Sequence, residues 1–291
     1  MKKKKVCFIV NPISGVGRQK KIEALTQAYL NKDIFDYKIQ YTQGPKDATK
    51  IAKSAANSDV DIVAIVGGDG SVNEAATGLI NTTTPLVIIP AGSGNGLARH
   101  LKMPINLKKA IQQMHTYKQS QIDTATLNGH PFFNVAGIGF DALIANRFDT
   151  FGKRGISSYI QLIFKEFFTY QAKNYQLFVN NKRYDANAFS VSFCNGSQFG
   201  NNAYISPQAN ISDGKLNVAI LKKINAFNVF RLAALLLLRR IHRSNHYLEL
   251  TGNHISIIQE DEFAHIDGDP IKCGKKITVE LKQKSLLVLT P

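Results

Sequence analysis

Three glycines and one aspartate, residues 67–70, lie between two segments with different secondary-structure preferences. The short apolar run before them, residues 61–66, predicts a buried β-strand, and residues 71–79 have the pattern of a helix start. Glycine allows a sharp turn and a close approach of a ligand to the backbone, and a helix N-terminus attracts anions. Asp69 would repel a phosphate unless a cation lay between them, which indicates Mg²⁺. A simple turn capped by Ser71 or Asp69 explains the segment equally well.

Strand and helix signals alternate through the first 123 residues, which predicts a parallel sheet covered by helices. Ligands of such sheets bind in the loops beyond the C-terminal ends of the strands. Glycine-containing loops follow three of the expected strands, at residues 11–17, 67–70 and 90–96. Because all three loops belong to the same edge of the sheet, they favour a binding site over a simple turn.

From about residue 124 the chain changes to short β-like runs separated by turn dipeptides such as Asn128-Gly129. The expected fold class is therefore α/β plus β-rich. An N-terminal α/β domain with a parallel sheet would comprise residues 1–123, and residues 284–291 would return to it at the end of the chain. A sandwich-like or barrel-like β domain would comprise residues 124–283.

Composition limits the partners and the compartment. The net charge of +15 favours nucleotides, anionic lipid surfaces or nucleic acid, although no basic–aromatic motif supports nucleic-acid binding. The three cysteines are far apart, which indicates reduced thiols in the cytoplasm rather than a zinc site or disulfides. The strongest apolar run, residues 232–238, is far shorter than the roughly 20 residues that span a bilayer. We expect a soluble protein or a peripheral one at the inner face of the membrane, and a homodimer is one option that the sequence leaves open.

Two other ligand-binding motifs can be compared directly with the sequence. No segment has the glycine and lysine spacing of a Walker A loop. Residues 137–142 partly match a dinucleotide-binding fingerprint, but they lie in the β-rich half and no clear βαβ unit follows them. A glycine-rich turn or bulge is the favoured interpretation of this segment.

Six further motifs occur in order, with suitable gaps, over nearly the whole chain. They are Asn11-Pro12-x-Ser14-Gly15, Gly67-Gly68-Asp69-Gly70-Ser71-x-Asn73-Glu74, Pro90-Ala91-Gly92-Ser93-Gly94-Asn95, Asn134-x-Ala136-Gly137-x-Gly139, Pro207-x-Ala209-Asn210-x-x-Asp213-Gly214-x-Leu216 and Asp267-Gly268-Asp269. Together they resemble the catalytic domain of the diacylglycerol kinase family, which includes bacterial diacylglycerol and phosphatidylglycerol kinases, sphingosine kinases and ceramide kinases. One such motif is weak, but six in order make a specific match.

The resemblance implies a two-domain lipid kinase that transfers the γ-phosphate of ATP to a lipid hydroxyl with the help of Mg²⁺. Its nucleotide would lie between an α/β domain, related in fold to the NAD kinases and phosphofructokinases, and a β-sandwich domain. The motif residues that would contact the nucleotide or its phosphates are Asn11, Ser14, Gly15, Thr42, Gly67, Gly68, Asp69, Gly70, Ser71, Asn73, Glu74, Ser93 and Asn95.

The same resemblance indicates acidic residues for catalysis and for a metal. A lipid hydroxyl needs a base, and the family motif is usually Asp-Gly-Glu, so the base stays open here between Asp267 and the shorter second acid Asp269. Asp69 would act beside the phosphates. A structural Mg²⁺ site of bacterial members matches Asn210, Asp213 and the carbonyl group of Lys215, because oxygen ligands suit that ion. An Asp-Gly turn without a metal explains these residues nearly as well.

The acceptor lipid and its surroundings are less constrained. Two apolar helices with basic flanks, expected at residues 157–170 and 226–241, suit a membrane interface, although packing as ordinary core helices is the favoured interpretation over direct insertion. Gly96 is more typical of sphingosine kinases, but only Asp141 and Asp149 lie where those enzymes hold an amine. A diacylglycerol-type acceptor is expected, and the alternatives are a sphingoid base, an NAD-kinase-like phosphotransferase and a non-catalytic nucleotide or lipid sensor.

Overall fold

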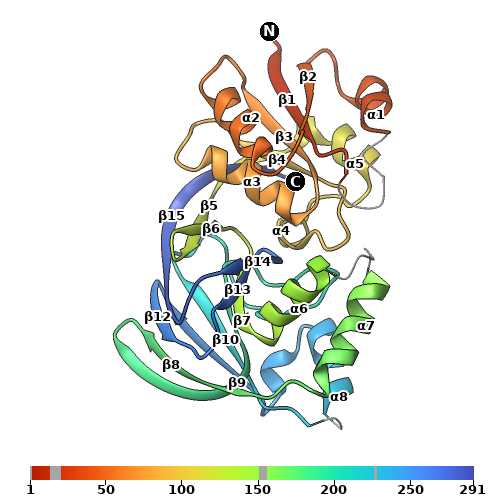
Figure 1. Ribbon diagram of the computed structural model, residues 1–291. Helices are drawn as coiled ribbons and strands as arrows, with labels where there is room; N and C mark the ends of the chain where they lie inside the picture. The colour runs from red at the N-terminus through yellow and green to blue at the C-terminus, as the bar shows by residue number, and fades with distance from the viewer. Residues whose placement is uncertain (1, 14–20, 151–155, 226–227) are drawn as a thin grey trace. The chain divides into compact units, whose positions relative to one another are not determined.

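The computed structural model describes residues 2–13, 21–150, 156–225 and 228–291. The chain forms two compact units (Figure 1). The first comprises residues 1–122 with 284–291, and the second comprises residues 123–283.

The first unit is built on a parallel sheet with the strand order β15-β4-β3-β1-β2. Strands β1, β3 and β4 are almost wholly apolar and buried, as expected where helices cover both faces of a parallel sheet. The last strand, β15, joins this sheet where Val288 pairs with Leu86. The strands are β1 (Lys4–Val10), β2 (Phe35–Tyr41), β3 (Ile62–Gly67), β4 (Leu86–Pro90) and the end of β15 (Lys276–Thr290).

Five α-helices flank this sheet (Figure 1), and two of them pack closely. A Cβ atom on Gly78 would lie 2.5 Å from the carbonyl oxygen of Thr49, so α2 and α3 are in contact through their main chains. The helices are α1 (Ile22–Tyr29), α2 (Asp47–Ala56), α3 (Asp69–Leu79), α4 (Gly96–His100) and α5 (Leu107–Gln112), and a short 3-10 helix, η2 (Met114–Thr116), follows α5.

The second unit is an antiparallel β structure around one apolar core. Its strands follow the order β14-β13-β7-β9-β8-β12-β15, with β10 pairing β9 and β11, and β5 pairing β6 and β15. Phe132, Phe193 and Tyr175 are among its largest buried side chains. The strands are β5 (Lys118–Leu127), β6 (His130–Phe132), β7 (Val135–Gly139), β8 (Lys173–Val179), β9 (Lys182–Cys194), β10 (Leu216–Lys222), β11 (Tyr247–Gly252), β12 (His254–Ile258), β13 (Phe263–Ile266) and β14 (Asp269–Lys272).

Three hairpins of this unit turn through two residues that both have positive φ angles. Such angles define a type I′ turn, whose twist matches that of the flanking strands, and they favour asparagine, aspartate and glycine. The turn residues are Asn128-Gly129 between β5 and β6, Asn180-Asn181 between β8 and β9, and Asp267-Gly268 between β13 and β14.

Three helices complete the second unit. They are α6 (Phe140–Thr150), α7 (Ile156–Phe167) and α8 (Val229–Leu237), and a 3-10 helix, η3 (Ile241–Arg243), follows α8. Phe167, Leu232 and Ile241 join Phe189 of β9 in a separate apolar cluster under the helices.

The expected fold class is confirmed, with an α/β N-terminal part and a β-sandwich C-terminal part. Residues 132–136 are divided between β6 and β7. Of the two interpretations of residues 137–142, the structure has a glycine turn and not a bulge, because Gly139, at φ +91°, ends β7 and α6 follows immediately. Among the residues that the structure describes, none of the helices has the length and hydropathy that a membrane span requires.

Candidate active site

The expected loops of the first unit meet at one edge of the sheet. Gly67 ends β3 and pairs with Pro90, the last residue of β4, and its carbonyl oxygen accepts a hydrogen bond from the amide of Ala91 at 2.9 Å. The amide of Asn11, which follows β1, donates to the carbonyl oxygen of Val66 at 3.2 Å. The three loops therefore begin side by side, as the parallel arrangement requires.

Two of these loops touch through glycine. A Cβ atom on Gly92 would lie 2.5 Å from the Cα atom of Gly68 and 3.0 Å from the side-chain oxygen of Asn95. Real Cβ atoms essentially never come so close to a backbone atom. Glycine is therefore needed at position 92 for the contact and not only for a turn.

Asp69 fixes the same two loops. Its carboxylate accepts hydrogen bonds from the amides of Asn95, at 2.8 Å, and Gly96, at 2.7 Å, and so caps the start of α4. Asn95 has a positive φ of 54°, and its side chain bonds to both the amide and the carbonyl group of Gly92. Asp69 thus holds the 92–96 loop against the start of its own helix.

The start of α3 follows a glycine loop. Its N-cap residue is Gly68, which makes no side-chain cap hydrogen bond. The side chain of Asn11 donates to Ser71 Oγ at 2.9 Å and accepts from the amide of Ile13 at 3.1 Å, so it links the first loop to this helix. A helix start in a glycine loop is a favourable place for an anion.

The other residues predicted to contact the nucleotide do not all lie at this edge of the sheet. Glu74 accepts hydrogen bonds from the amides of Lys46, at 2.7 Å, and Ala48, at 3.2 Å, and thereby caps α2. Thr42 is buried and directly follows β2, Asn73 lies in α3, and Ser93 is exposed. Ser14 and Gly15 lie outside the described residues.

In the second unit, the Asp267 side chain anchors its hairpin turn to a neighbouring loop. Its carboxylate accepts hydrogen bonds from the amides of residues 133, 134 and 135 at 3.0, 2.9 and 3.1 Å. Its own amide donates to the carbonyl oxygen of Val135 at 2.9 Å. Asp269, the first residue of β14, is exposed. The two candidate bases therefore have very different surroundings.

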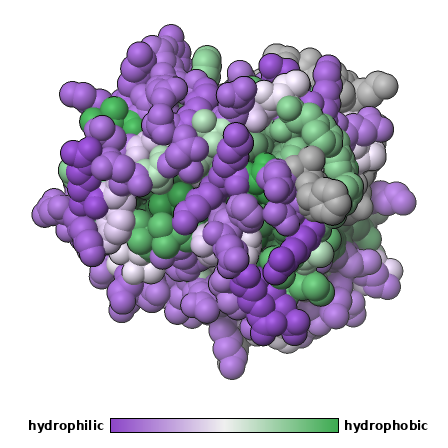
Figure 2. Space-filling model, turned by 90° about the horizontal axis from the view of Figure 1, so that it is seen from below, coloured by the Kyte–Doolittle hydropathy of each residue, from purple (hydrophilic) through white to green (hydrophobic). Residues whose placement is uncertain are grey.

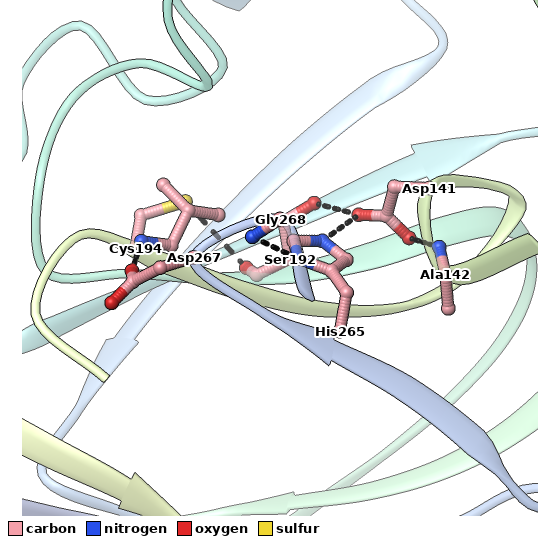
Figure 3. Close-up of polar contacts among 8 residues, drawn as sticks. Asp141, Ala142, Ser192, Cys194, His265, Asp267 and Gly268 are labelled. Atoms are coloured by element: carbon pink, nitrogen blue, oxygen red, sulfur yellow. Dashed lines mark hydrogen bonds and ion pairs between the residues drawn. The ribbon is translucent and has the colours of Figure 1, made fainter. Parts of the chain in front are cut away.

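A polar cluster that the sequence analysis missed lies behind this turn (Figure 3). His265 Nδ1 lies 3.4 Å from the amide of Gly268, and its Nε2 lies 3.4 Å from Asp141 Oδ2. Asp141 also accepts hydrogen bonds from Ser192 Oγ, at 2.9 Å, and from the amide of Ala142, at 3.0 Å. Nδ1 of the ring therefore faces the turn, and Nε2 faces Asp141.

The sequence carried one signal for this cluster. A Cβ atom on Gly137 would lie 2.3 Å from Asp141 Oδ2 and 2.8 Å from His265 Nε2. The first glycine of the 137–142 segment is therefore needed for the space that the two side chains occupy. His265 itself had no local signal, because its partners are distant in sequence.

The candidate metal loop is closed by its own hydrogen bonds. Asn210 Oδ1 accepts from the amide of Ser212 at 3.1 Å, Asp213 Oδ1 accepts from the amide of Lys215 at 3.0 Å, and the buried Asp123 accepts from Gly214 at 2.8 Å. Asn210 and Asp213 are exposed, and their side-chain oxygens are of the kind that Mg²⁺ prefers as ligands. Within the described residues, no group of three or more histidine, cysteine or acidic side chains could hold a metal, so the Mg²⁺ site stays a prediction.

Comparison with known proteins establishes the family. Residues 5–127 match the diacylglycerol kinase catalytic domain, and residues 134–289 match the YegS C-terminal NAD kinase beta sandwich-like domain. A Staphylococcus haemolyticus protein named "Putative lipid kinase" is 30% identical over 267 residues, which cover 87% of this chain and 85% of that protein. The chain belongs to the diacylglycerol kinase family of lipid kinases.

Other relatives agree with this assignment. A Bacillus subtilis protein named "Diacylglycerol kinase" is 25% identical over 274 residues, which cover 91% of this chain and 90% of the relative. A crystal structure from Bacillus anthracis, described as "a putative diacylglycerol kinase", has a TM-score of 0.83 at 25% identity and covers 100% of this chain and 98% of its own. The resemblance based on the six motifs is confirmed.

The glycine contact of this lipid kinase family member can be tested by adding one methyl group. We expect Gly92→Ala to lower the free energy of unfolding by roughly 1–3 kcal/mol, because two main chains must separate. Nucleotide affinity should fall as well. Gly44→Ala is the matched control, since nothing lies within 4 Å of its Cβ position. Denaturant unfolding and calorimetric ATP binding measure both effects, and equal stability of the two variants would contradict the contact.

The pKa of His100, the last residue of α4, predicts a pH dependence. Burial and, to a smaller extent, the charge of Lys102 lower this pKa from 6.5 to about 4. Between about pH 6.5 and pH 4, His100 is protonated in the unfolded chain but not in the folded chain. The free energy of unfolding should therefore decrease as the pH falls below about 6.5 and level off below about pH 4. In urea unfolding between pH 7.5 and 4, His100→Gln should lose less stability than the unaltered protein. If the free energies of unfolding of the two proteins changed in parallel with pH, His100 would not contribute to the pH dependence.

Proposed function

We propose that this member of the lipid kinase family transfers the γ-phosphate of ATP to the hydroxyl group of a diacylglycerol-type lipid. The observation that carries the proposal is the pair of glycine loops held together at the start of α3. There the main chains of Gly68 and Gly92 lie in close contact, and Asp69 holds the second loop in place. Main-chain amides in such an arrangement suit a polyphosphate.

Mg²⁺ would neutralise the charge that develops on the transferring phosphate. Asp69 is the acidic residue at this edge of the sheet, and its position within the first turn of α3 suits a cation between carboxylate and phosphate. Its hydrogen bonds to two amides fix the orientation of the carboxylate. Asn11 and Ser71 form a hydrogen-bonded pair beside it, which supports their predicted role as nucleotide contacts.

Asp267 is our choice for the base. A base acts best when its carboxylate is held in one orientation, and three main-chain amides hold Asp267. Its Oδ2 atom accepts the amide of Phe133, and its Oδ1 atom accepts the other two. As the lipid oxygen forms its bond to phosphorus and ADP leaves, the hydroxyl proton would pass to this carboxylate. We propose that His265 and Asp141 support the turn from behind through the amide of Gly268.

Paired variants separate the two acids. Asp267→Asn should lower kcat by about 100-fold or more, because the amide group cannot accept the proton. It should also lower stability by roughly 1–3 kcal/mol, because an NH₂ group then faces a main-chain donor. Asp269→Asn, the matched control, should lose less than about tenfold in kcat, with unchanged stability. A larger loss in Asp269→Asn than in Asp267→Asn would move the base to Asp269.

The surroundings of Asp141 favour a neutral acceptor lipid over a sphingoid base as the substrate. The side chain that could hold an amine is 13% exposed and is already engaged by His265, Ser192 and the amide of Ala142. A lipid ammonium group would have to displace these partners. The other candidate, Asp149, has a side chain outside the described part of the structure.

The acceptor can be identified with radiolabelled ATP. With Mg²⁺ and [γ-³²P]ATP, we expect labelling of diacylglycerol in mixed micelles and little labelling of sphingosine. Sphingosine labelling alone would replace the acceptor with a sphingoid base, and labelling of NAD alone would indicate a soluble acceptor. Nucleotide binding without any labelling would contradict the kinase proposal and favour a sensor.

A further inference from the structure

Helices α7 and α8 expose large apolar side chains on one side of the second unit. Phe168, the residue after α7, is 67% exposed, and Phe230 of α8 is 69% exposed. Leu237 and Leu238, at the end of α8, are 58% and 63% exposed. Figure 2 shows apolar side chains gathered on the right of the view, the side on which these helices lie in Figure 1. We call Ile160, Phe164, Phe168, Phe230, Leu237 and Leu238 the apolar face.

The apolar face is continuous across the two helices. The rings of Phe164 in α7 and Phe230 in α8 lie 6.1 Å apart. The opposite sides of the same helices supply Phe167 and Leu232 to the buried cluster beneath. The unit's own core therefore uses one side of each helix and leaves the apolar face in solvent.

The segment that contains α8 is basic, with Arg231 in the helix and Arg239, Arg240 and Arg243 directly after it. The 34 residues from 215 to 248, which include α8, contain seven basic residues and no acidic one. All seven are exposed, and the nearest acid in α7, Glu166, is buried against Arg147. The basic residues are Lys215, Lys222, Lys223, Arg231, Arg239, Arg240 and Arg243.

We propose that the apolar face docks on a lipid bilayer that carries anionic headgroups. Aromatic and leucine side chains would enter the interface, and the arginines would lie at the level of the phosphates. The charge argues against a second copy of this chain as the occupant, because two such faces would bring the arginines in and after α8 of both copies together. The inference rests on the proposed function in one respect: the lipid substrate would lie in the bilayer to which the protein binds.

Vesicle binding without ATP tests the surface separately from catalysis. The unaltered protein should sediment with phosphatidylcholine vesicles that contain phosphatidylglycerol, and much less with phosphatidylcholine alone. Arg240→Gln with Arg243→Gln should weaken binding roughly 30-fold, at about fivefold for each basic residue removed. Phe168→Ser with Phe230→Ser should weaken it about tenfold or more. High salt should reduce the arginine effect.

Matched controls use exposed residues elsewhere in the same unit. Ile258, on β12, is 43% exposed, and Lys275 lies in the turn before β15. Ile258→Ser and Lys275→Gln should bind vesicles like the unaltered protein. Equal losses in these controls, or unchanged binding in both double variants, would overturn the docking surface. Protein-concentration-dependent dimers that the phenylalanine variants abolish, with no vesicle binding, would assign the face to a second copy.

The kinase reaction separates this inference from the proposed function. The double variants should phosphorylate diacylglycerol in detergent micelles at the normal rate and lose activity on vesicles. Vesicle binding in a protein without kinase activity would contradict the proposed function and leave the docking surface standing. Equal loss of activity in micelles and vesicles would contradict a role for this face in bilayer docking.

Discussion

The close approach of two main chains at Gly68 and Gly92 is the constraint on which the loop edge of the first unit depends. Neither residue can carry a side chain without a shift of backbone atoms. The contact alone would not be stable, because it leaves the amides at the start of α4 without partners. Asp69 satisfies two of them, at Asn95 and Gly96, and so converts a contact between loops into a fixed arrangement.

The same device recurs in other family motifs. Asp69 caps α4, Glu74 caps α2, and Asp267 binds the amides of residues 133, 134 and 135, between β6 and the start of β7. In each case a carboxylate from one segment satisfies main-chain donors of another. Hydrogen bonds to charged groups are stronger than those between neutral ones, which suits loops that have few apolar contacts of their own. Acidic residues of the family motifs therefore shape the loops in which they lie.

Local patterns predicted the parts of the fold that depend on neighbouring residues. The alternation of strands and helices and the glycine loops at strand ends came from the sequence, as did the Asn128-Gly129 turn. The break between β6 and β7 did not, because the residue that holds it, Asp267, is more than 130 residues away. The hydrogen bonds of Glu74 to Lys46 and Ala48 were not predictable either, because these partners precede it by 28 and 26 residues. Such pairings leave no periodic signal.

The two outer helices show a different limit of sequence patterns. Both α7 and α8 carry many apolar residues, and the sequence pattern alone does not say which of them the unit's own core covers. The distinction is set by what lies beneath: the cluster around Phe167 and Phe189 accepts one side of each helix, and nothing in the described part of the unit covers Phe168 or Phe230. An exposed phenylalanine has a free-energy cost in water that folding alone does not recover. The exposed phenylalanines beside a long stretch without acidic residues are explained by a partner with an apolar interior and a negatively charged surface.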